Sequence, residues 1–207
     1  MSHGTLKWLR FATPSLLMLV FAYIVGKVTG AWDITIPEKP ADFLPTGVAL
    51  GLSFAYDLTP LRNMANSRYF ARVTEKLRTG LLGIAGVQDA PERYPWNLVR
   101  PIFWRLVDND KSLTNKASLA YFNGFLWTMA ADIRALATLF LLLSLFGWYL
   151  IINNADLCAL IFALVLTASF FISIIVTRRH INIGAEQLEI IERYHKKELT
   201  EKLEEIT

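Results

Sequence analysis

The sequence has little of what catalytic and disulfide-bonded proteins commonly use. Of its 207 residues one is cysteine and three are histidine, and 19% are charged, against about 25% in soluble domains. A single cysteine excludes an internal disulfide and a cysteine-ligated metal cluster. The chain also has no nucleophile–base signature, nucleotide fingerprint or metal-ligand spacing. We therefore predict no catalytic residue, no cofactor and no metal site, and expect that the protein is not an enzyme. A lipid-modifying enzyme with dispersed polar residues is the one enzymatic alternative left open.

Charge is missing altogether from two long segments near the carboxyl end. Residues 135–152 and 157–177 contain no charged side chain, and Arg178 and Arg179 follow the second segment. A helix needs about 20 apolar residues to cross a bilayer core. The connection at residues 153–156 is short and has a turn composition. Because 207 residues cannot wrap two such helices in a soluble core, we predict a transmembrane hairpin.

Two shorter apolar segments lie near the amino end. Lys7 and Arg10 precede the first, residues 11–26, which we interpret as a span or signal anchor; a secretory signal peptide begins in the same way. The second, residues 41–57, is short for an untilted span and suits a tilted span or a re-entrant segment. Its Gly47 and Gly51 are candidate helix-packing residues, because glycines four residues apart give a flat helix face.

The distribution of basic residues predicts the topology. From residue 62 to residue 116 there are ten Lys or Arg against five Asp or Glu, whereas residues 27–42 and 153–156 contain only Lys27 and Lys39 as basic residues. Basic residues stay on the cytoplasmic side of a membrane. Four spans place every basic stretch inside the cell. We therefore predict an all-α integral protein of the cell inner membrane, multi-pass, with both termini in the cytoplasm.

This topology divides the chain into four regions. Residues 1–57 form an N-terminal membrane hairpin, and residues 58–133 form a basic, helical cytoplasmic region. Residues 134–178 form the C-terminal transmembrane hairpin. Residues 179–207 continue as a cytoplasmic amphipathic helix, because their apolar residues recur at roughly helical spacing.

A basic stripe lies in the cytoplasmic region. Arg68, Arg72 and Lys76 are spaced by four residues, so on a helix they share one face. Anionic lipids of the inner leaflet attract such a stripe. An anion or nucleic-acid contact would rest on charge alone, so we expect no direct nucleic-acid binding. We interpret the three residues as candidates for docking membrane lipids or a protein partner.

Two further groups are candidates for the same docking surface. One is an aromatic and basic patch of Trp96, Arg100, Trp104 and Arg105, a composition that binds headgroups or partner proteins. The other is the apolar side of the tail helix, which needs a partner if it projects into water. That partner is the 61–107 region of the same chain, another copy, or a different protein. The tail candidates are Leu188, Ile191 and Leu199.

Polar residues between these features predict a helix start and a membrane boundary. Ser112 or Thr114 is expected to cap a helix that begins near Lys116 and runs towards the third span. Asp132 and Arg134 lie just before the uncharged segment, and we interpret them as markers of the bilayer boundary.

In length, in its four proposed spans (11–26, 41–57, 135–152 and 157–177) and in its basic middle and tail, the chain resembles the KwaA-like four-span membrane subunits of the Kiwa antiphage defence system. The resemblance implies an inner-membrane homo-oligomer that senses phage attack and holds a soluble DNA-binding partner beneath the membrane. It is one of layout, so it carries over no functional residue. The hairpin-plus-tail layout is also similar to the two-span effectors of nucleotide-signalling defence, which disrupt membranes.

Two classes of function follow. The first is a membrane scaffold or sensor subunit that forms a homo-oligomer and recruits a soluble cytoplasmic protein. The alternative is an oligomeric pore-forming or membrane-disrupting effector. A pore requires polar residues repeating along one face of a span, and only Thr167, Ser169 and Ser173 come near that pattern. The sequence therefore favours the scaffold.

Overall fold

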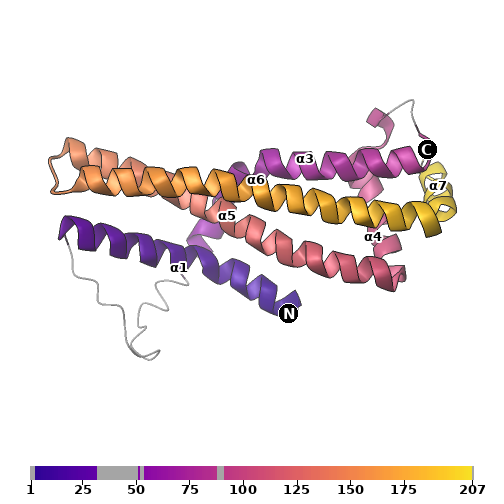
Figure 1. Ribbon diagram of the computed structural model, residues 1–207, viewed down its shortest axis with the longest axis horizontal. Coiled ribbons are helices and arrows are strands. Elements are labelled where there is room, and N and C mark those ends of the chain that lie inside the picture. The colour runs from indigo at the N-terminus through magenta and orange to yellow at the C-terminus, as the bar shows by residue number, and fades with distance from the viewer. Residues whose placement is uncertain (1–2, 32–50, 52–53, 88–90, 207) are drawn as a thin grey trace. The chain divides into compact units, whose positions relative to one another are not determined.

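The computed structural model describes residues 3–31, 51, 54–87 and 91–206, and within these ranges regular structure is helical with no strand (Figure 1). The all-α prediction is confirmed. The elements are α1 (His3–Thr29), α3 (Leu61–Ile84), the 3-10 turn η2 (Pro91–Arg93), α4 (Trp96–Asn109), α5 (Lys111–Tyr149), α6 (Ala155–Tyr194) and α7 (Lys196–Glu204).

Three of these helices, α1, α5 and α6, are long and apolar enough to cross a membrane. They contain the predicted spans 11–26 and 157–177 and most of 135–152. Residues 41–50 and 52–53 of the fourth predicted span, 41–57, lie outside the described residues, and Gly47 is among them. Gly51 is helical and exposed, and a Cβ placed on it would meet no atom within 4 Å.

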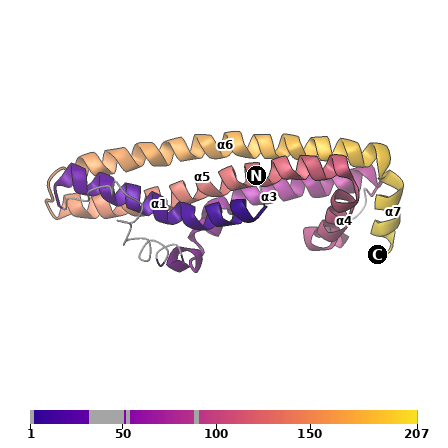
Figure 2. The ribbon, with the colours of Figure 1, turned by 90° about the horizontal axis from the view of Figure 1, so that it is seen from below.

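The chain forms two compact units, and each is considered by itself. Unit 1 consists of residues 1–66 and 125–174. Its core is built on three phenylalanines, one from each of the apolar helices α1, α5 and α6, which run alongside one another in Figure 2. The ring of Phe21 meets those of Phe140 and Phe162 edge-on, with centroids 5.5 and 5.1 Å apart. These contacts hold α1 against α5 and α6, because such edge contacts add to the burial of large rings.

Besides its buried phenylalanines, unit 1 has small or polar side chains inside, and it carries many large apolar side chains on its outside. Ala137, Ser144 and Cys158 are buried, whereas Phe146 and Leu164 are 61% and 62% exposed. Water would disfavour so many exposed apolar groups, but lipid covers them at no cost, and small residues let membrane helices approach closely. The pattern is that of a membrane bundle.

The α5–α6 turn lies slightly earlier than predicted. Helix α5 ends at Tyr149 and α6 begins at Ala155, so the turn starts at Leu150 and not at Asn153. Asn154 has a φ of 54°, in the left-handed region that asparagine enters more readily than most residues. Its side-chain Nδ2 donates to the carbonyl of Val28 at 2.9 Å. The turn is therefore tied to the last turn of α1.

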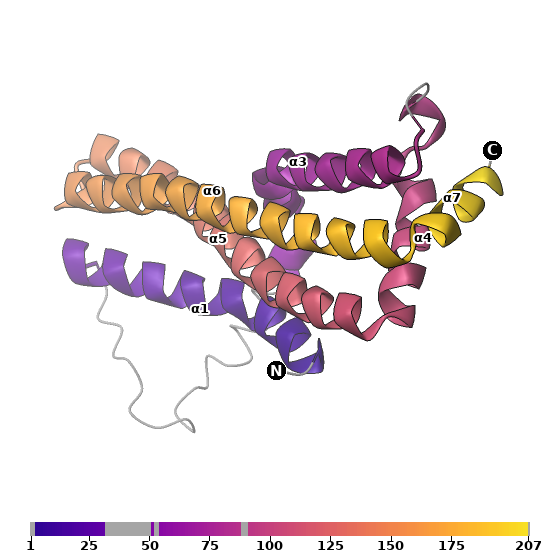
Figure 3. The ribbon, with the colours of Figure 1, turned by 45° about the vertical axis from the view of Figure 1, so that its right-hand side comes forward.

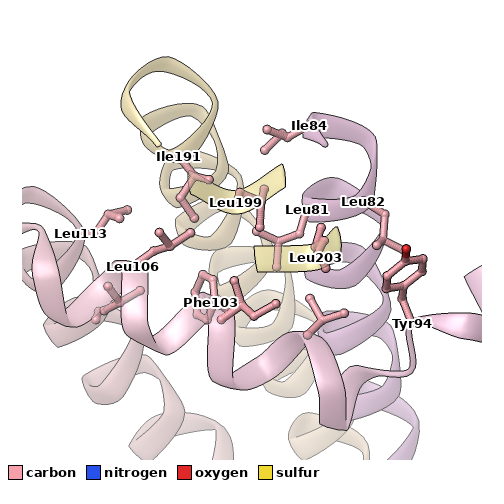
Figure 4. Packing of buried hydrophobic residues seen from close by; sticks show 14 residues of the cluster. Leu81, Leu82, Ile84, Tyr94, Phe103, Leu106, Leu113, Ile191, Leu199 and Leu203 are labelled. Atoms are coloured by element: carbon pink, nitrogen blue, oxygen red, sulfur yellow. The ribbon is translucent and has the colours of Figure 1, made fainter. Parts of the chain in front are cut away.

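Unit 2 consists of residues 67–124 and 175–207. Helices α4 and α7 pack side by side (Figure 3). Side chains from all five helices of the unit meet in one core (Figure 4), including Leu81 of α3, Phe103 of α4, Leu113 of α5, Ile191 of α6 and Leu199 of α7. The sequence left three partners open for the apolar side of the tail helix. In the structure this side packs against the same chain.

Helices α3 and α6 meet through two reciprocal glycine contacts in unit 2. The side chain of Leu188 covers Gly80, and that of Leu77 covers Gly184. A Cβ on Gly80 would lie 2.3 Å from Cδ1 of Leu188, and one on Gly184 would lie 2.9 Å from Cδ2 of Leu77. The absence of side chains at both glycines therefore sets how closely the helices approach.

A matched pair of substitutions tests this contact. Gly83→Ala, on the same helix, is expected to stabilise unit 2 by up to about 1 kcal/mol, because alanine is the better helix former and its Cβ would meet nothing within 4 Å. Gly80→Ala is expected to gain less stability than Gly83→Ala, since the side chain of Leu188 must move to make room for the new Cβ. Amide hydrogen exchange across α3 and α6 measures both. If the two variants change amide hydrogen exchange equally, the close approach of α3 and α6 at Gly80 is contradicted.

Candidate functional site: a buried ionic cluster and a basic surface

Unit 1 contains a buried carboxylate that is paired with an arginine. The side chain of Asp132 has no exposed surface. Arg62 grips it with two hydrogen bonds, from Nε to Oδ1 at 2.7 Å and from Nη2 to Oδ2 at 3.1 Å. The hydroxyl of Tyr56 donates to Oδ1 at 3.0 Å. This forked geometry is the strongest form of arginine–carboxylate pair.

Arg62 connects further segments to the same carboxylate. Its Nη1 forms an ion pair with Oδ1 of Asp57 at 2.9 Å, and its Nη2 donates to the carbonyl of Arg10 at 3.0 Å. Its guanidinium also lies 5.5 Å from the ring centroid of Tyr56, within the range of a cation–π contact. One arginine thus holds α1, residues 56 and 57, and α5 to the start of α3.

Arg134 makes a second set of contacts two residues along α5. It is 7% exposed. It donates to the carbonyl of Ala65 and to the hydroxyl of Ser173, and it lies 4.9 Å from the ring centroid of Phe170. Asp132 and Arg134, which the sequence marked as boundary residues, therefore also fasten α5 to α3 and α6.

We call the residues of these contacts the ionic cluster: Arg10, Tyr56, Asp57, Arg62, Asp132, Arg134 and Ser173. It lies at one end of the apolar part of each long helix. From it to the far end of α1 or α5, or from Ser173 back to the start of α6, is about 26–29 Å at 1.5 Å per residue. A hydrocarbon core is about 30 Å thick. The cluster therefore lies where uncharged helix of membrane-spanning length begins.

The contacts of the ionic cluster indicate a structural role, in which the cluster holds the helices of unit 1 together. Both oxygens of Asp132 accept hydrogen bonds from arginine, and one also accepts from tyrosine. That carboxylate is thus occupied by donors. Among the described residues no group of three His, Cys, Asp or Glu side chains is placed to hold a metal ion.

The basic stripe is a solvent-facing surface of α3 in unit 2. Arg68, Arg72 and Lys76 are all exposed, and none of them forms an ion pair with a described residue. Val73 is buried on the other side of the helix. The stripe is thus a band of positive charge with nothing in the described chain to neutralise it.

The aromatic and basic patch is partly used by the fold. Trp96 and Trp104 pack against the core of unit 2, and Trp104 stacks on Tyr121 with centroids 5.8 Å apart and planes 8° apart. Arg100 is exposed, and Nε of Arg105 lies 3.9 Å from Oε1 of Glu198. The patch therefore leaves Arg100 as its one fully solvent-facing cation without an ion pair to a described residue.

The tail residues were wrongly assigned to the docking surface. Ile191 and Leu199 have no exposed surface, and Leu188 is half-buried against Gly80. The physical reason is that α6 and α7 turn their apolar sides towards α3 and α4 of the same unit, where burial is worth about 25 cal/mol per Å². These side chains stabilise unit 2 and do not contact a partner.

The cap of α5 was also wrongly assigned. The helix begins at Lys111, not near Lys116, and its cap is Asp110, whose Oδ1 accepts from the backbone N–H of Leu113 at 2.9 Å. Its Oδ2 lies 3.0 Å from Nε2 of His195. These bonds, the one to His195 first, lower the pKa of Asp110. Thr114 instead donates its hydroxyl to the carbonyl of Val107 at 2.8 Å.

This carboxylate should make the stability of unit 2 depend on pH. A carboxyl with a lowered folded-state pKa adds stability above its unfolded pKa of about 3.9, and loses it as pH falls through the folded value. Asp110→Asn should therefore lower the unfolding temperature at pH 6, and this effect should shrink as the pH falls below about 3.9. Circular dichroism of the detergent-solubilised protein measures this. Asp108→Asn, at an exposed neighbour on α4, is the control, and equal pH profiles would contradict the role of Asp110.

The chain was compared with family models, with curated proteins and with solved structures. The chain matches no family model, no curated protein and no solved structure.

Proposed function

We propose that this protein is a scaffold or sensor subunit of the cell inner membrane, whose unit 2 recruits a soluble cytoplasmic protein. The observation that carries the proposal is the exposed and unpaired stripe of Arg68, Arg72 and Lys76. Unit 2 closes its own apolar core, so the stripe is presented by a preformed surface. An acidic partner or an anionic leaflet complements such a band of charge.

Contacts at the two ends of unit 1 support four spans. At one end, the α5–α6 turn is tied to Val28 near the end of α1. At the other, Tyr56 and Arg62 contact Asp132 and Arg10. Ala31 and Phe54 therefore lie at opposite ends of the unit, which fits the four spans that we propose. Both termini then share the basic, cytoplasmic side.

The hydroxyls of α6 weigh against the pore alternative. Ser169 and Ser173 are buried. The hydroxyl of Ser173 accepts from Arg134 and donates to the carbonyl of Ser169 at 2.8 Å. The hydroxyl of Ser169 donates to the carbonyl of Leu166 at 2.6 Å. These groups are satisfied within unit 1, which leaves Thr167 alone as an exposed hydroxyl of the three.

Purification in mild detergent, from cells that also express the neighbouring genes, tests the proposal. The expected result is a native mass that contains a soluble protein in fixed stoichiometry. The triple variant Arg68→Glu, Arg72→Glu, Lys76→Glu should lose that protein while still inserting into membranes. The control reverses Arg193, Lys196 and Lys197, which are also exposed in unit 2. A ring of this chain alone that conducts ions in liposomes would contradict the scaffold and favour the pore.

The layout shared with Kiwa membrane subunits supports a role in antiphage defence. We propose that the recruited protein acts when phage attack disturbs the membrane. Phage should form fewer plaques on cells that carry the wild-type gene with its neighbours than on cells that carry the stripe variant with the same neighbours. Equal plaque numbers across a broad phage panel would contradict this role.

A further inference from the structure

A cavity of about 260 Å³ lies within unit 1, between the end of α1 and the α5–α6 turn. Small side chains form its inner part: Ser144, Gly147 and Ala155 line it and are buried. Leu143 and Ile152 also line it and are 55% and 45% exposed. The cavity therefore opens from the interior of unit 1 towards the outside of its helices.

The two hydroxyls among the described residues that line the cavity already form hydrogen bonds. Thr29 donates its Oγ1 hydroxyl to the carbonyl of Val25 at 2.7 Å, and Ser144 donates to the carbonyl of Phe140 at 2.8 Å. A buried water needs two to four polar partners, whereas an apolar cavity of about 150 Å³ stays dry and binds benzene. The larger cavity of unit 1 therefore suits a hydrocarbon.

The position of the cavity along the helices matches one leaflet of a bilayer. Its lining residues on α5 run from Phe140 to Gly147, which is about 11 Å at 1.5 Å per residue. Gly147 lies near the end of this helix at Tyr149. A leaflet contributes about 15 Å of hydrocarbon, half of a core about 30 Å thick. With α1, α5 and α6 across a bilayer, the cavity lies within one leaflet and runs in the direction of its acyl chains.

We propose that this cavity binds one acyl chain of a membrane phospholipid. An unfilled cavity destabilises a protein in proportion to its volume, and in a bilayer the molecules beside the opening are acyl chains. A chain bound there contacts α1 at Val25 and α5 at Phe140, so the packing of α1 against the α5–α6 hairpin depends on lipid. The inference rests on the membrane placement of these helices and not on recruitment of a soluble protein.

A phosphatidylcholine with a diazirine on one acyl chain tests the site in liposomes. Cys158 lines the cavity and is 1% exposed, whereas Phe146 is 61% exposed and reports contact with bulk lipid. After irradiation, mass spectrometry is expected to find adducts at both residues of wild type. Ser144→Leu fills the cavity and should lower the yield at Cys158 severalfold, with the yield at Phe146 unchanged. Thr167→Leu, the same kind of exchange at an exposed position of α6, should lower neither.

Two outcomes of this labelling would overturn the proposal. One is a wild-type protein without an adduct at Cys158, and the other is an equal yield at Cys158 in Ser144→Leu. Val25→Phe fills the cavity from α1 and is expected to reproduce the loss, so the test does not depend on the folding of one variant. In lipid-free detergent the filled variants should unfold at or above the wild-type temperature.

Thermal unfolding in detergent gives an independent measurement. Unlabelled phosphatidylcholine has no net charge, so it does not engage the basic stripe. It should raise the unfolding temperature of wild type more than that of Ser144→Leu, because a ligand of the folded state stabilises it. An equal rise in both, or a rise with free palmitate but not with phospholipid, would overturn the assignment. Recovery of a soluble partner by wild type is read separately and bears on the proposed function alone.

Discussion

Asp132→Ala is expected to be among the most destabilising single substitutions in unit 1, at about 3–5 kcal/mol. The variant removes the carboxylate that Arg62 grips with two hydrogen bonds and Tyr56 with one. Arg62, whose side chain is 22% exposed, would then keep only the partly exposed Asp57 as its counterion. The cost arises chiefly from the half-buried donors of Arg62 that lose their acceptor and less from the lost attraction, since a polar group without a partner in an apolar setting is expensive.

The single native cysteine provides the measurement. Cys158 is buried in unit 1, so a thiol-reactive fluorophore labels it when that unit opens. Labelling of Asp132→Ala during heating in detergent should begin at a markedly lower temperature than that of wild type. Asp156→Ala is the control, because Asp156 is an exposed acid in the first turn of α6.

A compensating variant makes the test specific. Asp132→Leu combined with Arg62→Met removes both charges and restores apolar volume, so it should recover much of the stability that Asp132→Ala loses. If the double variant is as unstable as the single one, shape and not charge is decisive at this position. If Cys158 in Asp132→Ala is labelled at the same temperature as in wild type, the ionic cluster does not stabilise unit 1.

Ile191→Ala is expected to destabilise unit 2 by about 2–5 kcal/mol, the usual range for truncating a fully buried large aliphatic side chain. Ile191 has no exposed surface and belongs to the core that contains Leu81, Phe103 and Leu199. The core of so small a unit has few side chains to repack, so the cavity is expected to persist.

The control for this prediction lies on the same helix and in the same unit. Ile175 is 66% exposed, so Ile175→Ala removes the same atoms without opening a cavity in the core. Amide hydrogen exchange in α4 and α7 should accelerate strongly in Ile191→Ala and little in Ile175→Ala. Similar exchange in the two variants would mean that Ile191 does not hold the core together.

The sequence predicted the fold well where the composition of a continuous segment determines its structure. Charge-free segments of about the length that crosses a bilayer core predicted the apolar helices, and apolar periodicity predicted a helical tail. It was uninformative where structure depends on pairing between distant residues. The sequence shows Asp132 next to an uncharged segment, but Arg62 lies 70 positions away, so nothing local indicates that they pair.

The error in the tail has the same origin. The spacing of Ile191 and Leu199 correctly indicates an apolar side, but periodicity cannot say what covers it. The same pattern serves a partner protein or a neighbouring helix equally well. Likewise Asp110 was a better cap candidate than Ser112, yet its bond to His195 requires two helix ends that are 85 positions apart to meet.

The discontinuous composition of unit 2 determines the order in which the chain can mature. Helices α3 and α4 are translated before the hairpin of α5 and α6, but the side chains that complete their core, Ile191, Leu199 and Leu203, are translated after it. The amphipathic α4 must therefore wait with its apolar side uncovered until α6 and α7 have been synthesised. Completion of these last two helices thus becomes a checkpoint, because unit 2 cannot close its core in a chain that lacks them.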